Sequence, residues 1–98
     1  MICMKIYKHG DELLVSACDE NILGKYFKEG KFRLRVKKKF YDGIRVNAET
    51  LKEYLEKATI ANLVGEETVN CAIEAGIVDP DCVIRIQNVP HAQMVRML

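Results

Sequence analysis

The 98-residue chain lacks any apolar run long enough to cross a membrane, and its first residues lack the hydrophobic stretch of a signal peptide. A membrane-spanning helix needs about 18 or more consecutive apolar residues, and a signal peptide carries an apolar segment after its basic start. We therefore expect a cytoplasmic protein without membrane contact. A chain of this length suffices for one hydrophobic core and leaves little room for another, so residues 1–98 are predicted to form a single globular domain.

The four cysteines lack the close spacing of metal-binding or redox pairs, since no Cys-x-x-Cys occurs. Structural zinc sites usually take their ligands in closely spaced pairs from turns. The cysteines lie instead in apolar or alternating stretches, which favours buried thiols in a chain without a secretion signal. We therefore predict no metal and no other cofactor. The alternative is a zinc site formed by Cys3 and Cys18 and completed by Cys71, Cys82 or a histidine.

Catalytic motifs are also absent: the sequence has no nucleophilic serine motif, no His-x-x-x-His and no carboxylate pair beside a histidine. Pro90 has no backbone donor and should leave the preceding strand pairing, which places His91 in a rigid segment just past a strand. His91 is the best candidate for proton transfer, because a histidine titrates near neutral pH. A single histidine is not an active site, so we expect a non-catalytic protein.

Local patterns predict a hairpin at the N-terminus. Residues 2–8 alternate between the two faces of a strand, residues 13–18 form a second apolar run, and Gly10 provides the turn between them. Asp19 and Gly24 are suited to begin and end a single helical turn after the hairpin. Pairing about the Gly10 turn predicts three cross-strand pairs: Ile6 with Val15, Met4 with Ala17, and Cys3 with Cys18.

The rest of the chain predicts two main helices and further strands. Asn47 is a good N-cap for an amphipathic helix over residues 48–58. A strand over 59–64, a helix and a strand over 82–86 form a right-handed βαβ unit whose two strands should run parallel. Residues 92–98 alternate as a last strand. The predicted fold is mixed α/β, with an N-terminal β-hairpin, a basic strand, the βαβ unit and two main helices packed on one mixed sheet.

The near-neutral total charge hides a basic segment, residues 25–45, which holds nine basic and two acidic residues. Residues 31–37 alternate strictly, so Phe32, Leu34 and Val36 should face the core while basic side chains line the other face. Phosphate backbones bind such surfaces without regard to sequence, and aromatic rings can stack on bases. The predicted nucleic-acid contacts are Lys31, Arg33, Arg35, Lys37 and Lys39, flanked by the aromatic residues Tyr26, Phe27, Phe40 and Tyr41.

Two features of the strand–helix unit indicate a possible pocket. Asn62 is a polar amide inside an apolar strand and must find hydrogen bonds if it is buried. Gly65 lets the chain turn sharply into a helix, but Glu66 and Glu67 follow it, and a phosphate-binding turn needs several glycines and an uncluttered helix start. We therefore predict no phosphate site at this turn and expect Asn62, Gly65 and His91 to line any pocket.

Three segments together, residues 17–25 (ACDENILGK), 61–69 (ANLVGEETV) and 89–93 (VPHAQ), resemble a family of small archaeal proteins known as domain of unknown function number 424. The resemblance covers essentially the whole chain. It implies an archaeal, cytoplasmic, single-domain α/β protein and brings no established activity, cofactor or catalytic residue. The residues that match its recurring motifs are the pocket candidates Asp19, Asn62, Gly65, Glu66, Pro90 and His91, together with Gly24.

These patterns lead to three hypotheses and to three alternatives for the basic strand alone. The first is a non-catalytic module that binds RNA or associates with a ribonucleoprotein through the basic segment. The second is a small enzyme or ligand-binding protein with a pocket at Asn62, Gly65 and His91. The third is an interaction subunit that forms a homodimer through the C-terminal strand, residues 93–98, because an apolar strand at a chain end packs on its own sheet or on a partner. The basic strand alone also fits a solvated sheet edge, a site for a phosphate-bearing small ligand or a surface for an acidic protein.

Overall fold

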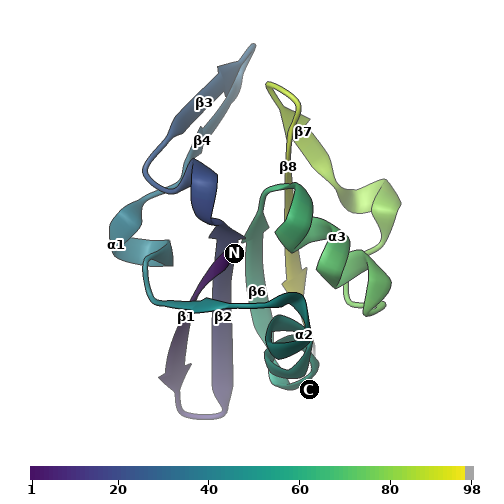
Figure 1. Cartoon of the computed structure of the whole chain (residues 1–98). Helices are drawn as coiled ribbons and strands as arrows, with labels where there is room; N and C mark the ends of the chain where they lie inside the picture. Colours follow the sequence, from purple (N-terminus) through teal and green to yellow (C-terminus); the bar gives the residue numbers. More distant parts are fainter. Residues whose placement is uncertain (97–98) are drawn as a thin grey trace.

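The computed structural model describes residues 1–96, which form a mixed six-stranded sheet and a separate two-stranded hairpin (Figure 1). The strand order of the sheet is β5-β1-β2-β6-β8-β7, and β3 pairs with β4. The strands are β1 (Ile2–His9), β2 (Glu12–Asp19), β3 (Tyr26–Glu29), β4 (Phe32–Arg35), β5 (Ile44–Val46), β6 (Ile60–Val64), β7 (Ile84–Ile86) and β8 (Val89–Val95). The helices are α1 (Lys38–Tyr41), α2 (Ala48–Lys57) and α3 (Glu66–Glu74), with short 3-10 turns η1 (Glu20–Ile22) and η2 (Pro80–Cys82). The predicted mixed α/β class with two main helices is confirmed.

The N-terminal hairpin forms as predicted. β1 and β2 pair antiparallel around Gly10, whose φ of +59° is accessible to glycine without steric cost. Because side chains alternate along a strand, this register sends Cys3, Lys5 and Tyr7 to the sheet face opposite α2 and α3. The register contains all three predicted pairs, Ile6 with Val15, Met4 with Ala17, and Cys3 with Cys18.

Helices α2 and α3 cover one face of the sheet and enclose the larger core (Figure 1). Asn47 precedes α2 as predicted, and its side chain accepts the N–H of Thr50 at 2.9 Å. Leu51, Leu55 and Ala58 are fully buried against the sheet. Burial of each leucine stabilises the folded state by roughly 1.5–3 kcal/mol, which holds α2 on this face.

Within residues 1–96, no helix is long and apolar enough to cross a membrane.

On the opposite face of the sheet, η1, α1 and the β3–β4 hairpin pack around a second, smaller core. Leu34 and Val36 are buried there, as the alternation predicted. Phe32, which was expected to face the core, is 54% exposed. This prediction is wrong because the hairpin forms its own small sheet. Phe32 pairs with Glu29 at the free end of that hairpin, outside the core that buries Leu34.

The strand–helix–strand unit has the predicted strand directions with an unexpected neighbour. β8 pairs antiparallel with both β6 and β7, so β6 and β7 run parallel on either side of β8. β7 is shorter than predicted, and Cys82 is exposed in η2 because the turn that begins at Asp79 continues through it. Cys3, Cys18 and Cys71 are buried as predicted. Within residues 1–96, no three His, Cys, Asp or Glu side chains are placed to hold a metal ion.

Pro90 lies inside β8, which corrects the prediction that it leaves the pairing and that His91 follows a strand. The chain reverses earlier, at Gln87 and Asn88, whose φ values of +49° and +65° suit a two-residue hairpin turn. The carbonyl oxygen of Pro90 accepts the N–H of Gly65 at 2.9 Å. The nitrogen of Pro90 also faces β6. It lies just beyond Val64 and His91, the last residue pair of β6 and β8, so the missing N–H group breaks no hydrogen bond between the paired strands.

The C-terminal strand has one open side. β8 pairs with β6 along residues 91–95 but with β7 only along residues 89–91. Within residues 1–96, Gln93 and Val95 therefore have no strand neighbour on the β7 side. Homodimer formation through residues 93–98 stays a prediction, and the last two residues of that segment lie outside the described part of the chain.

Candidate functional site

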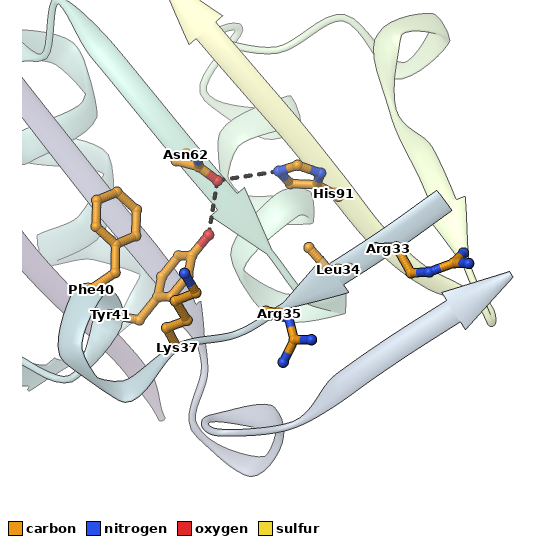
Figure 2. A pocket seen from close by; sticks show the side chains of 8 residues that line it. All are labelled: Arg33, Leu34, Arg35, Lys37, Phe40, Tyr41, Asn62 and His91. Carbon is orange, nitrogen blue, oxygen red and sulfur yellow. Dashed lines mark hydrogen bonds between the residues drawn. The ribbon is translucent and has the colours of Figure 1, made fainter. Parts of the chain in front are cut away.

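The basic segment and the Asn62–His91 pair meet in one pocket on the sheet face opposite α2 and α3 (Figure 2). The pocket has a volume of about 370 Å³ and lies between β4 and α1 on one side and β6 and β8 on the other. Its lining residues are Arg33, Leu34, Arg35, Lys37, Phe40, Tyr41, Asn62 and His91. Two regions that the sequence indicated separately thus form one surface.

Asn62 is the centre of the polar contacts in this pocket. Its Oδ1 atom accepts a hydrogen bond from the Tyr41 hydroxyl at 2.8 Å and lies 3.1 Å from Nε2 of His91 (Figure 2). Strand alternation places both side chains on the same face, since His91 pairs with Val64 and Asn62 lies two residues before Val64. The expectation that this amide finds hydrogen-bond partners is met by residues from α1 and β8.

The contact with Asn62 selects one tautomer of His91. An amide oxygen only accepts hydrogen bonds, so Nε2 carries the proton and the neutral ring keeps Nδ1 as an acceptor. Burial lowers the pKa of His91, because charging the ring in a partly dry site costs free energy. Burial also raises the pKa of Tyr41, so its hydroxyl stays protonated and donates a hydrogen bond to Oδ1 of Asn62. The floor of the pocket is therefore uncharged at neutral pH.

The positive charge lies around the rim of this neutral floor. Arg33 and Arg35 are exposed, and in Figure 2 their side chains extend away from the floor. Arg33 donates to the carbonyl oxygen of Gly30 at 2.8 Å, and the guanidinium of Arg35 lies 4.3 Å from the ring centre of Tyr26. Within residues 1–96, no ion pair involves a basic residue between positions 25 and 39. These charges are therefore available to a ligand.

The five basic residues predicted to contact nucleic acid do not lie on one strand. Arg33 and Arg35 lie in β4, but Lys31 lies in the hairpin turn and Lys39 lies in α1. The direction changes at Lys37, which has an extended backbone and immediately precedes α1. All five side chains are exposed, and Arg33, Arg35 and Lys37 line the pocket.

Asp19 and Gly65 form a structural contact outside the pocket. Asp19 accepts hydrogen bonds from the backbone N–H groups of Glu67 and Thr68 at 3.1 and 2.9 Å, and from the Thr68 hydroxyl at 2.8 Å. Its side chain thus caps α3 from β2 and makes no such bond to η1, the turn that the sequence had assigned to it. Gly65 has φ +108° and ψ 157°, and a Cβ at this position would lie within 2.6 Å of Oδ1 of Asp19.

Glu66 and Pro90 also lie outside the pocket. Glu66 is exposed, and its Oε1 lies 2.6 Å from Nη1 of Arg85, a contact that lowers the pKa of Glu66. Pro90 is fully buried. Among the six pocket candidates from the sequence, Asn62 and His91 line the pocket. The role of Tyr41 as the partner of Asn62 was missed, because 21 residues separate the two and no local pattern connects them.

Comparisons with known proteins identify a family and a fold. The family model described as "Protein of unknown function (DUF424)" matches residues 7–97, in agreement with the resemblance of the three sequence segments. The crystal structure of an uncharacterized conserved protein from Methanopyrus kandleri is similar, with a TM-score of 0.77 and 24% identity over 99% of this chain and 95% of that chain. At this identity the similarity shows the fold alone. No curated protein sequence matches the chain.

Proposed function

Since the chain belongs to the DUF424 family, whose description names no activity, we propose a function from the site itself: the protein binds single-stranded RNA at the pocket between the basic segment and the Asn62–His91 pair. The RNA is free or part of a ribonucleoprotein. The observation that supports this most strongly is that three cations, two aromatic rings and an uncharged amide–imidazole floor line one pocket.

Unpaired cations supply the attraction for an RNA backbone. Each phosphate that a lysine or arginine neutralises releases condensed counterions, which favours binding at low salt. Arg33, Arg35 and Lys37 are exposed at the rim, and none of them has a carboxylate partner within residues 1–96. A bound phosphate therefore does not have to displace an existing ion pair.

The floor of the pocket suits an unpaired base. A base that enters a pocket of about 370 Å³ must leave its duplex, so binding should favour single strands. The half-buried Phe40 offers aromatic surface, Nδ1 of His91 offers an acceptor, and the amide nitrogen of Asn62 offers donors, while Tyr41 is only 4% exposed and holds Asn62 in place. Single-stranded RNA is recognised by this combination of stacking and hydrogen bonds to base edges.

A small phosphate-bearing ligand is the second candidate for the same pocket. It is favoured by the orientation of His91, because Asn62 holds Nε2 while Nδ1 remains able to accept a proton from a substrate. A general base of this kind must come within hydrogen-bond distance of the proton that it removes. Affinity that does not increase with RNA length would favour this ligand, or an enzyme that acts on it, over RNA.

Binding to a short single-stranded RNA at several salt concentrations tests the proposal. We expect the affinity of the native protein to fall between about 50 and 200 mM salt, with a slope of about −0.7 per phosphate contact in a plot of log K against log salt. Arg33→Gln combined with Arg35→Gln should reduce the magnitude of this slope by about 1.4, because two phosphate contacts are lost. Fluorescence anisotropy of a labelled RNA measures the affinity at each salt concentration.

Lys57→Gln combined with Arg96→Gln is the matched control. It removes the same charge from the α2 side of the molecule, where both residues are exposed and Arg96 donates to the carbonyl oxygen of Glu56. This variant should keep the native slope. Equal slopes for the two double variants would mean that the basic segment is only a solvated surface. Tighter binding to duplex RNA would contradict the binding of an unpaired base.

A further inference from the structure

A second pocket adjoins the first one beside α1. It has a volume of about 320 Å³, and its lining residues are all basic or aromatic: Lys5, Tyr7, Lys37, Lys39 and Phe40. Lys37 and Phe40 line both pockets, so the two hollows share one cation and one aromatic ring. A ligand that fills one pocket therefore lies next to the other.

Contacts between β1 and α1 fix the floor of the second pocket. The rings of Tyr7 and Phe40 stack, with centroids 5.4 Å apart and an angle of 18° between their planes. The Tyr7 hydroxyl donates to the carbonyl oxygen of Phe40 at 2.9 Å, and Nζ of Lys5 donates to the carbonyl oxygen of Lys39 at 2.9 Å. Both rings are half-buried and already hold this position before a ligand binds, and Nζ of Lys5 lies 5.5 Å from the ring centre of Tyr7.

Lys37 is the link between the hollows on this surface. It also lines a third and smaller one, of about 140 Å³, together with Lys25 and Arg35. None of the residues that line the three hollows is acidic. A phosphodiester carries one negative charge between two bases, and Lys37 is a cation shared by two pockets that each contain an aromatic ring.

We propose that the second pocket is a subsite for the neighbouring nucleotide of the same RNA, with its base on the Tyr7–Phe40 pair and the linking phosphate at Lys37. This inference rests on the proposed function and adds that the ligand needs two consecutive nucleotides. A mononucleotide fills one pocket, whereas a dinucleotide places one base in each pocket. Lys5 and Lys39 then contact the phosphate on the far side of the second base.

Tyr7→Trp gives a direct optical test, because the native chain has no tryptophan and residue 7 lines the second pocket but not the first. A base stacked on the new indole should quench its fluorescence when a dinucleotide binds. The dinucleotide should also bind about tenfold more tightly than the mononucleotide, which is the gain that one additional stacked base gives. Fluorescence titration of this variant with both ligands measures quenching and affinity together.

Lys39→Gln tests the charge of the same subsite without changing a ring. With a short single-stranded RNA, it should reduce the magnitude of the salt slope by about 0.7, the value for one phosphate contact. Lys38→Gln is the matched control, because Lys38 is an exposed neighbour in α1 that lines neither of the two large pockets. Thermal unfolding of each variant establishes that it is folded before its affinity is compared.

The outcomes separate this inference from the proposed function. If RNA binding depends on Arg33 and Arg35 but the indole is not quenched and Lys39→Gln behaves as Lys38→Gln does, the second subsite is wrong and RNA binding stands. If no RNA binds at low salt, both proposals fall. Quenching by the dinucleotide together with the reduced salt slope of Lys39→Gln would support both.

Discussion

Replacing Gly65 with alanine is expected to lower the free energy of unfolding by about 3 kcal/mol, as the sum of backbone strain and the loss of a helix cap. The backbone at Gly65 has φ +108° and ψ 157°, a region that residues other than glycine essentially never adopt. The new Cβ would also lie within 2.6 Å of Oδ1 of Asp19 and would push this carboxylate away from the N–H groups of α3. Urea denaturation of the native and variant proteins measures the difference.

Asp19→Ala separates these two causes. It removes three hydrogen bonds, to Glu67 and Thr68, and introduces no backbone strain. The expected loss is about 2 kcal/mol, which corresponds to a fall in Tm of roughly 8–16 °C. In the double variant the overlap with the carboxylate is gone, so Gly65→Ala should cost only its backbone strain. The combined effect should therefore be smaller than the sum of the single effects.

Gly76→Ala is the control for backbone strain alone. Gly76 has φ +73°, and a Cβ at this position would meet no atom within 4 Å. The expected loss is about 1 kcal/mol, the cost of a left-handed conformation for alanine. Losses of equal size for Gly65→Ala and Gly76→Ala, or strict additivity between Asp19→Ala and Gly65→Ala, would contradict the contact between Asp19 and Gly65.

Asn62→Leu should destabilise the protein by about 3 kcal/mol, because the Tyr41 hydroxyl and the Nε2–H group of His91 both lose their acceptor. Each buried polar group without a partner costs roughly 1–3 kcal/mol. Asn62→Asp is the matched variant, since its carboxylate can accept the same two hydrogen bonds. It should retain more stability than Asn62→Leu at neutral pH, and urea denaturation compares the two. Equal losses would mean that these hydrogen bonds do not stabilise the fold.

The pH dependence of stability reports on the same contact. Burial lowers the pKa of His91 in the folded protein below the usual 6.5. At pH values between the folded pKa and 6.5, His91 therefore binds more protons in the unfolded chain than in the folded protein. The contribution of His91 is therefore complete above about pH 6.5 and is lost as the pH falls through the folded pKa. In Asn62→Asp the carboxylate beside Nε2 should raise the pKa of His91 and weaken or reverse this dependence. His91→Gln should remove it, and Tm between about pH 5.5 and 8 is the measurement.

Local periodicity predicted the parts of the fold whose partners are close in sequence. The β1–β2 register follows from alternation and one glycine turn, and α2 starts after its capping residue Asn47. Alternation also separated the buried residues Leu34 and Val36 from the charged residues beside them. It failed at Phe32, because alternation shows which residues share a face and does not show how much of the strand another layer covers.

The candidate site depends on contacts that are distant in sequence. Tyr41, Asn62 and His91 come from α1, β6 and β8, and separations of 21 and 29 residues leave no spacing pattern. They meet because β8 lies beside β6, whereas the prediction had Pro90 leave the pairing before His91. In the sequence, the local feature that indicated this site was the polar amide of Asn62 in an otherwise apolar strand.

The basic segment and the Asn62–His91 pair are proposed to form one RNA site. NMR titration of the isotope-labelled protein with a short single-stranded RNA tests it most directly, because each residue gives a separate signal. We predict that the signals of Arg33, Arg35 and Lys37, the side-chain amide of Asn62 and the ring of His91 shift together at the same RNA concentrations. Shifts of the basic residues alone, with Asn62 and His91 unchanged, would contradict the claim.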